Sequence, residues 1–282
     1  MSSSLTLGTE MVNKRIGIFD SGFGGLHVMR AIVRALPQYD YVYLGDAARA
    51  PYGDRQQKEI YKFTKQAVEF LFAHDCELVI LACNTASSEA LRNIQKLFVP
   101  KYAPEKKVLG VLIPAAEEAS RRSRGKQIGV LATRGTVESQ SFVRELAKLD
   151  PDIRVFQKEC PLLVPLIEAG KQNSPKTRAV LERYLHPLLR KNIDTLILGC
   201  THYGILEKQI RNIIGRDIVI ISEARAVPKK LKAYLEKHSD IEAKLSKKGT
   251  VHFFSTGDTG TFAFIGRKFF GMKIQVEKAS LR

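Results

Sequence analysis

Residues 77–86 read E-L-V-I-L-A-C-N-T-A, and residues 194–203 read D-T-L-I-L-G-C-T-H-Y. Each stretch has an acidic residue, an aliphatic run, a small residue and a cysteine, followed by hydroxyl or amide side chains. The two cysteines, Cys83 and Cys200, are 117 positions apart. A second pair of similar stretches, I-G-I-F at 16–19 and I-G-V-L at 128–131, is offset by 112 positions. Two pairs at nearly one offset predict two similar halves, each with a cysteine at the end of a buried strand.

The composition is typical of a globular protein that remains in the cytoplasm. Hydrophobic residues make up 44% of the chain and charged residues 26%, which is enough for a substantial core. Every apolar run is far shorter than the ~20 residues that span a membrane. The start, M-S-S-S-L-T, lacks the charged and apolar regions of a signal peptide. We therefore expect a cytoplasmic protein with reduced cysteines.

The charge is strongly basic, with 45 Lys and Arg against 29 Asp and Glu, a net charge of +16. This excess has two explanations: a nucleic-acid partner, or a solvated basic surface that steers an anionic substrate. The basic residues gather only modestly, at 121–126, 229–232 and 247–248, without interleaved aromatic residues. The pattern favours the solvated surface over nucleic-acid binding.

Short aliphatic runs alternate with segments of helical periodicity along the chain. The predicted strands are 15–19, 41–44, 78–82, 108–112, 128–132, 153–156, 195–198, 218–221 and 251–254. The predicted helices are 26–33, 56–72, 85–97, 138–149, 177–189, one from about 206, 224–236 and 262–270, with a connector at Pro100 and Pro104. This alternation predicts an α/β fold with parallel sheets and right-handed crossovers.

The strand ends carry the candidate chemistry. In open α/β sheets, ligands bind at the carboxyl ends of strands, where the prediction places Asp20, Cys83 and Cys200. Asn84 and Thr201 follow the two cysteines and can begin a helix. A thiol at a helix N-terminus feels the helix dipole, so we expect both thiols to have a pKa lowered from about 8.5 toward neutrality. Two such thiols could each accept or donate a proton near pH 7.

The glycine-rich stretch D-S-G-F-G-G at 20–25 has more than one interpretation. A dinucleotide fingerprint requires a glycine where this chain has His27, so a Rossmann cofactor is disfavoured. The turn amides and Ser21 could instead bind a carboxylate. Alternatively, Asp20 only caps a tight turn between strand and helix.

Three further residues are ambiguous from pattern alone. His202 could tune the Cys200 thiol, or it could be a loop histidine bonded to backbone. Glu168 is either a buried acid or a charge on a helix face. Tyr52 lies with Asp46 in a loop of small residues, and loops at strand ends often carry function.

The sequence contains none of the common metal and cofactor motifs. The four cysteines form no C-x-x-C pair, and there is no P-loop and no H-E-x-x-H. No lysine stands in a context that singles it out for pyridoxal phosphate. We therefore expect neither a metal nor an organic cofactor.

Several motifs together resemble those of the cofactor-independent glutamate racemases in the aspartate/glutamate racemase family. They cover nearly the whole chain: I-G-I-F-D-S-G-F-G-G-L (16–26), Y-L-G-D-A-A-R-A-P-Y-G (43–53), A-C-N-T-A-S (82–87), A-T-R-G-T-V-E-S (132–139), C-P-L-L-V-P-L-I-E (160–168) and L-G-C-T-H-Y (198–203).

The resemblance implies two pseudo-symmetric flavodoxin-like domains with the active site in the cleft between them. The first domain would span 14–109, completed by 222–282, and the second 110–221. Cys83 and Cys200 would exchange the α-proton of glutamate, and D-glutamate would supply peptidoglycan synthesis. The implied assisting residues are Asp20, Glu168 and His202, and the implied substrate-binding residues are Asp20, Ser21, Tyr52, Gly53, Asn84, Thr85, Thr201 and His202.

Some alternatives stay open beside this resemblance. An aspartate racemase or a decarboxylase would share much of the pattern, but a decarboxylase would need only one of the two cysteines. The choice between aspartate and glutamate depends on the depth of the pocket, and a homodimer stays an open alternative. His27 and Gly204 depart from the family, which often has a smaller residue and a proline at these positions.

Overall fold

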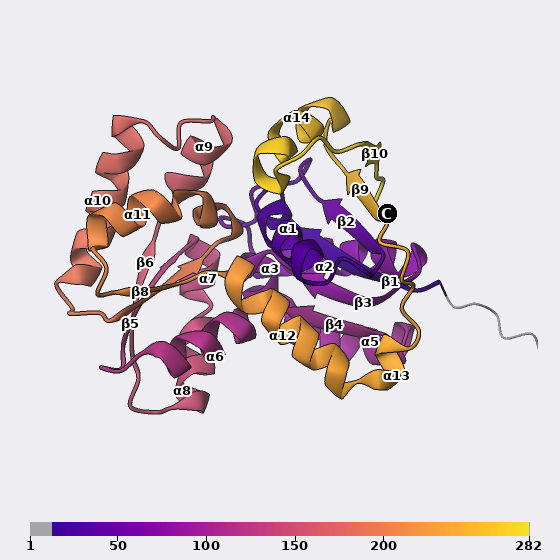
Figure 1. Ribbon diagram of the computed structural model, residues 1–282, viewed down its shortest axis with the longest axis horizontal. Helices are drawn as coiled ribbons and strands as arrows, with labels where there is room; N and C mark the ends of the chain where they lie inside the picture. The colour runs from indigo at the N-terminus through magenta and orange to yellow at the C-terminus, as the bar shows by residue number, and fades with distance from the viewer. Residues whose placement is uncertain (1–12, 282) are drawn as a thin grey trace, which may run out of the picture.

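The structure is a computed structural model that describes residues 13–281. The first residues, on which the expectation of no signal peptide rests, lie outside this part. The strands form two parallel sheets, as predicted (Figure 1). The first contains β1 (Arg15–Asp20), β2 (Tyr41–Gly45), β3 (Cys76–Leu81), β4 (Lys107–Gly110), β9 (Val251–Ser255) and β10 (Val276–Lys278). The second contains β5 (Gln127–Ala132), β6 (Arg154–Glu159), β7 (Thr195–Gly199) and β8 (Val219–Ile221).

The two sheets share one strand order. The six-stranded sheet runs β10-β9-β2-β1-β3-β4 and the four-stranded sheet β6-β5-β7-β8, with every pairing parallel. In each sheet the first strand lies between the second and the third, so the order reverses at β1 and at β5. Ligands of such sheets bind at this reversal, beyond the carboxyl ends of the strands.

Helices connect the strands and cover the sheets. The longer ones are α1 (Gly25–Ala35), α2 (Gln57–Ala73), α6 (Leu112–Arg122), α8 (Ser141–Leu149), α10 (Pro175–Leu189), α11 (Glu207–Ile214), α12 (Glu223–Lys237) and α14 (Thr259–Phe270). The shorter ones are α3 (Asn84–Glu89), α4 (Leu91–Asn93), the π-helix η1 (Ile94–Phe98), α5 (Val99–Tyr102), α7 (Arg134–Glu138), α9 (Leu163–Glu168), the 3₁₀ helix η2 (Thr201–Leu206) and α13 (Ser239–Glu242).

The prediction of a strand at 108–112 is wrong at its end. β4 stops at Gly110, and Leu112 begins α6, a helix that the sequence reasoning missed. Pro114 lies in the first turn of this helix. A first-turn amide has no helical partner, so the proline is tolerated there.

Two predicted helices are divided. The helix expected at 85–97 is interrupted at Ala90 and then continues through η1 and α5 to Tyr102. Pro100, expected in a connector, instead lies in the first turn of α5. The helix expected at 138–149 is broken at Gln140, whose φ of 52° is left-handed.

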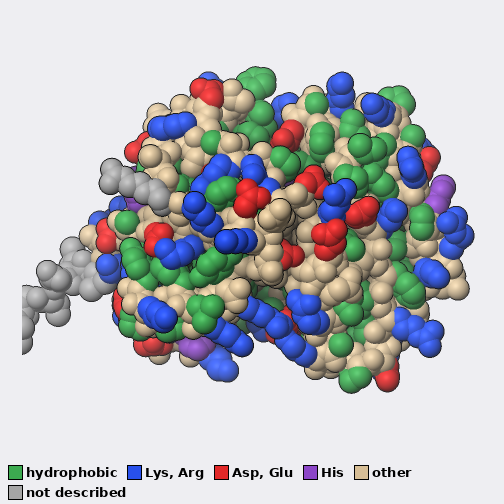
Figure 2. Space-filling model, turned by 180° about the vertical axis from the view of Figure 1, so that it is seen from behind, with side chains coloured by type: hydrophobic (Ala, Val, Ile, Leu, Met, Phe, Trp, Pro, Cys, Tyr) green, Lys and Arg blue, Asp and Glu red, His purple; other side chains and the backbone are tan. Residues whose placement is uncertain are grey.

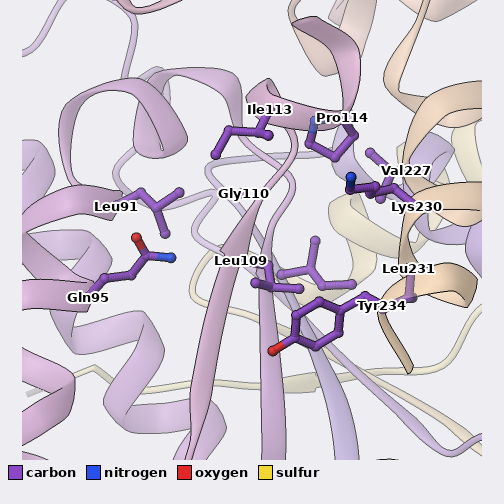
Figure 3. Close-up of a pocket in the computed structure, with 11 residues that line it drawn as sticks. Leu91, Gln95, Leu109, Gly110, Ile113, Pro114, Val227, Lys230, Leu231 and Tyr234 are labelled. Carbon is purple, nitrogen blue, oxygen red and sulfur yellow. The ribbon is translucent and has the colours of Figure 1, made fainter. Parts of the chain in front are cut away.

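The last part of the chain returns to the first sheet. β9 pairs with β2, β10 pairs with β9, and α12 packs against α1 and α6 (Figure 1). Where α12 faces β4 and α6, an apolar cavity of about 110 Å³ remains, with Leu109 and Tyr234 in its lining (Figure 3). The division of the chain into domains at 110 and 222 stays a prediction.

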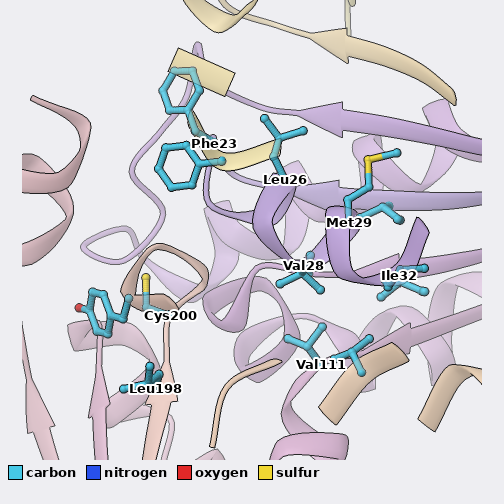
Figure 4. Close-up of a cluster of buried hydrophobic side chains, with 14 of the residues drawn as sticks. Phe23, Leu26, Val28, Met29, Ile32, Val111, Leu198 and Cys200 are labelled. Atoms are coloured by element: carbon cyan, nitrogen blue, oxygen red, sulfur yellow. The ribbon is translucent and has the colours of Figure 1, made fainter. Parts of the chain in front are cut away.

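The core joins both sheets. One cluster of buried side chains contains Leu26 and Met29 of α1 together with Leu198 of β7 and Cys200 (Figure 4). Helix α1 therefore packs between the first sheet and the segment that follows β7. Within residues 13–281, no helix is long and apolar enough to cross a membrane.

Candidate active site

The three predicted strand-end residues lie where expected. Asp20 is the last residue of β1, Cys83 follows β3 by two positions, and Cys200 directly follows β7. The Asp20 side chain is fully buried, and the two cysteines are 6% and 7% exposed. β1 pairs with β3 and β5 with β7, so each cysteine lies beside the strand at which its sheet reverses order.

Cys83 has a hydroxyl and an amide as neighbours. Its Sγ lies 3.3 Å from Ser21 Oγ and accepts a hydrogen bond from the amide of Ala86 at 3.5 Å. Cys83 lies at a helix N-terminus, as the sequence predicted, and its own sulfur caps α3. Ser21 and the amide both favour the thiolate form of Cys83, because they can donate to its charge.

Cys200 has a different set of partners. Its Sγ lies 3.9 Å from Nδ1 of His202, and Nε2 of His202 lies 3.0 Å from Oε1 of Glu168. With the ring proton on Nε2 and donated to Glu168, Nδ1 presents its lone pair to the thiol. Acid, imidazole and nucleophile in this order are the arrangement that activates serine and cysteine in other enzymes. The structure thus brings Glu168, His202 and Cys200 together.

Asp20 joins the two halves of the site. Thr201 Oγ1 donates to Asp20 Oδ1 at 3.3 Å, and the Gly22 amide donates to Oδ2 at 3.0 Å. Asp20 therefore caps its own turn, and the Gly22 amide is not free for a substrate carboxylate. At Gly24 a Cβ would collide with Thr201 Oγ1 and lie 2.6 Å from His202 Nδ1. Glycine there allows α1 to approach the segment after Cys200.

The expectation of lowered thiol pKa values is wrong. Burial and, to a smaller extent, the charge of Asp20 together raise the pKa of Cys83 to about 11, against the opposing hydrogen bonds from Ser21 and Ala86. Burial also raises the pKa of Cys200 well above its usual value, and the charge of Cys83 adds to this. α3 has six residues and η2 is a short 3₁₀ helix, so their dipoles are too small to offset desolvation. Burial likewise raises the pKa of Asp20.

Tyr52 is positioned differently from a free substrate-binding hydroxyl. Its ring is 1% exposed, and its hydroxyl donates to Asp46 Oδ2. Asp46 also accepts hydrogen bonds from Arg49 and Thr256, so its carboxylate fixes the conformation of this loop. The carbonyl of Gly53 accepts from the Gly135 amide at 2.9 Å, which ties the loop to the second half of the chain.

Asn84 and Thr85 both contact residues that the sequence reasoning did not select. Thr85 Oγ1 lies 3.0 Å from Thr133 Oγ1, which in turn donates to Thr136 Oγ1 at 3.1 Å. Asn84 Nδ2 donates to Glu223 Oε1 at 2.8 Å.

Two of the missed residues could have been found from sequence. Thr133 is related to Ser21 by the same 112-position offset that relates Ile128 to Ile16, so the repeat itself indicates it. Glu223 comes two residues after β8 and is a polar residue at a strand end, like Asp20. Thr136 has no comparable signal beyond its place in the motif at 132–139.

His27 and Gly204, the two positions expected from the resemblance to differ from the family, are neighbours in space. A Cβ at position 204 would lie 2.7 Å from Cδ2 of the His27 ring. The imidazole of His27 thus occupies the space that a side chain at position 204 would need, so the histidine at 27 fits with the glycine at 204.

Comparison with known proteins places the chain. The family model for Asp/Glu/hydantoin racemases matches residues 16–227. The chain belongs to the Asp/Glu/hydantoin racemase family. It is 38% identical over 265 residues to a glutamate racemase of Thermoanaerobacter pseudethanolicus, covering 94% of this chain and 96% of the relative.

Solved structures of racemases have the same fold. A glutamate racemase isoform from Bacillus anthracis matches with a TM-score of 0.88 and 34% identity, covering 96% of this chain and 98% of the other. A glutamate racemase from Francisella tularensis in complex with D-glutamate matches with a TM-score of 0.85 and 32% identity, covering 95% and 98%. The resemblance and the α/β fold expected from the motifs are therefore confirmed, and all predicted site residues lie within the matched span.

Proposed function

We propose that this protein interconverts L-glutamate and D-glutamate, with Cys83 and Cys200 as the two bases. The observation that carries this proposal is the placement of two thiols at equivalent strand ends of two sheets with the same strand order. Racemisation requires that a proton leave one face of Cα and another arrive at the opposite face. Two bases on opposite faces achieve this while the substrate stays in place.

Each thiol has its own proton acceptor in the proposal. Burial keeps both thiols protonated at neutral pH, so one must be deprotonated before it can act. His202 Nδ1 takes the proton of Cys200, and Glu168 stabilises the resulting imidazolium. On the other side, Asp20 takes the proton of Cys83. Ser21 stabilises the Cys83 thiolate by donating a hydrogen bond from its hydroxyl group. Cys83 then deprotonates D-glutamate, and Cys200 deprotonates L-glutamate.

Hydrogen-bond donors in the same site would hold the two carboxylates of the substrate. When the substrate binds, the hydroxyls of Thr85, Thr133 and Thr201 can rotate and donate to the two carboxylates together with nearby backbone amides. Thr133 would then give up its bond to Thr136, and Thr201 its bond to Asp20. Donors fixed around a carboxylate stabilise the negative charge that develops when the α-proton leaves. The product D-glutamate serves peptidoglycan synthesis, and we propose that the enzyme acts in the cytoplasm without a cofactor.

The test is proton NMR of L-glutamate with the purified protein in D₂O and no added cofactor, with circular dichroism of the same sample to measure how much D-glutamate has formed, since proton NMR does not distinguish the enantiomers. We expect D-glutamate to carry deuterium at Cα early in the reaction while the remaining L-glutamate stays protonated. The reason is that the abstracted proton stays on one sulfur and the other sulfur, equilibrated with solvent, delivers deuterium. Deuterium accumulating in the remaining substrate before product appears would contradict two bases. If the α-proton of aspartate exchanged and that of glutamate did not, the proposed substrate would be wrong.

A further inference from the structure

Glu223 is a buried acid for which the proposed reaction has no use. It is the first residue of α12, and it is 3% exposed. Within residues 13–281 no Lys, Arg or His forms a salt bridge with it. Its side chain instead accepts the hydrogen bond from Asn84 Nδ2. This bond joins the turn after β3 in one sheet to the turn after β8 in the other.

The bond decides which end of the Asn84 amide is available. An amide has one acceptor oxygen and one donor nitrogen, and an ionised carboxylate can only accept. Glu223 therefore fixes Nδ2 toward α12 and leaves Oδ1 on the other side. Asn84 Oδ1 is buried and has no hydrogen-bond partner among the described residues. Buried acceptors without a partner are rare in folded proteins, and each calls for a ligand or a function.

Glutamate carries only one group that this acceptor can bind. Its two carboxylates accept hydrogen bonds, and its α-ammonium group alone donates them. Asn84 directly follows Cys83, so its oxygen lies at one of the two proposed bases. The charges of Glu223 and Asp20 both act on Cys200 and raise its pKa, which places all these groups in one electrostatic environment. Such an environment of acids and a bare acceptor favours a cation.

We propose that Glu223 is a positioning residue that orients the Asn84 amide so that Oδ1 accepts a hydrogen bond from the α-ammonium group of glutamate. This inference rests on the proposed function, since it names how that same site holds its substrate. Glu223 itself touches neither the substrate nor the thiols in this role.

The experiment compares two ligands that differ only in the ammonium group. L-Glutamate and glutarate carry the same two carboxylates on the same chain, but glutarate lacks the amine. Their dissociation constants are measured by calorimetry for the wild type and for two variants, above neutral pH so that Glu223 is ionised. Glu223→Leu removes the acceptor for Asn84, whereas Glu223→Gln keeps an acceptor oxygen at the same place. Glu223→Ser, which is too short to reach Asn84, replaces the leucine variant if leucine prevents folding.

We expect Glu223→Leu to weaken glutamate binding roughly tenfold or more, the effect of a lost hydrogen bond to a charged group, and to change glutarate binding by less than about threefold. Glu223→Gln should restore most of the glutamate affinity. Equal weakening of both ligands would show a general disturbance of the pocket and overturn the proposal, as would unchanged glutamate binding in the leucine variant. The NMR exchange assay on the wild type tests the racemase proposal separately, because the ratio of glutamate binding to glutarate binding reports the contact with the ammonium group and not proton exchange.

Discussion

At the scale of single residues, the two candidate bases differ in what surrounds them. Cys83 has a hydroxyl and an amide, whereas Cys200 has an imidazole backed by a carboxylate. The other two cysteines, Cys76 in β3 and Cys160 after β6, are buried, and their sulfurs donate only to backbone carbonyls. Four free thiols of similar burial thus divide into two with proton-transfer partners and two without.

This division predicts the outcome of four alanine variants. Cys83→Ala and Cys200→Ala should each lower kcat for racemisation by on the order of 10³-fold or more, because each removes one of two required bases. Cys76→Ala and Cys160→Ala, the matched controls, should keep most of the activity. The measurement is circular dichroism of glutamate during turnover in both directions. A Cys200→Ala variant that racemises at nearly the wild-type rate would rule out the two-base scheme.

Glu223 predicts a pH dependence of stability. Burial raises its pKa from 4.5 to about 7, so the folded protein binds this proton more tightly than the unfolded chain does. The stability that this provides is complete below pH 4.5 and is lost as the pH rises to about 7. Relative to Glu223→Gln, the wild type should therefore lose up to about 3 kcal/mol of unfolding free energy across that window. Urea denaturation of both proteins at several pH values measures the difference, which would stay constant if Glu223 did not titrate there.

The sequence predicted where many of the candidate site residues lie but not their electrostatics. The repeat and the motifs led to Asp20, Cys83, Cys200 and their neighbours, because polar residues after buried strands can be read from pattern. The pKa values of the thiols were predicted in the wrong direction, since desolvation depends on packing from distant segments. The partner of Asn84, 139 residues away, was missed for the same reason.

At the scale of elements, the contact between α1 and η2 holds the site together. Thr201 and His202 of η2 lie against Gly24, the residue before α1, and the absence of a Cβ there permits the contact. The bond from Thr201 to Asp20 crosses the same contact.

Gly24→Ala should therefore separate these two elements. We expect kcat/KM to fall roughly a hundredfold, because a displacement of about 1 Å of catalytic groups has effects of that size. The protein should still fold, since the collision affects one side of one turn. Gly260→Ala in α14 is the control, because its Cβ would meet only Asp258 Oδ1, at 3.6 Å. Full activity in Gly24→Ala would show that the contact is not needed.

Elements were predicted well where periodicity was strong. The strands with buried aliphatic runs were found in order, and so were the long amphipathic helices other than α6. The errors lie where local signals conflict: α6 begins with a proline in its first turn, and Gln140 adopts a left-handed conformation that its residue type does not indicate. β10, with only three residues, is too short for a period to be seen.

At the scale of the whole molecule, basic side chains are spread over the surface. Figure 2 shows Lys and Arg over one entire face, with Asp and Glu among them, and not a single stripe. Arg121, Arg122 and Arg124 are exposed at and after the end of α6, and Arg121 pairs with Glu118. This distribution agrees with the solvated surface expected from the sequence.

Replacing these three arginines by glutamine should leave kcat unchanged. Capture of the anionic substrate should slow at low salt by less than about tenfold and recover at physiological salt, because only long-range steering is lost. Glutamine at Lys101, Lys248 and Lys273, which are also exposed, gives a control with the same change in charge. Measuring kcat and kcat/KM at two ionic strengths separates the cases. A collapse of kcat in the arginine variant alone would mean that its segment helps to build the site.

The unlike surroundings of Cys83 and Cys200 have a thermodynamic consequence for an enzyme of this kind. L- and D-glutamate are mirror images with equal free energy, so detailed balance requires the same kcat/KM in both directions. A pair of bases with different partners cannot favour one enantiomer in this ratio. The asymmetry can appear only as unequal kcat values for the two enantiomers, accompanied by KM values that are unequal by the same factor. A variant at His202 that changes the ratio of the two kcat values must therefore change the ratio of the two KM values equally.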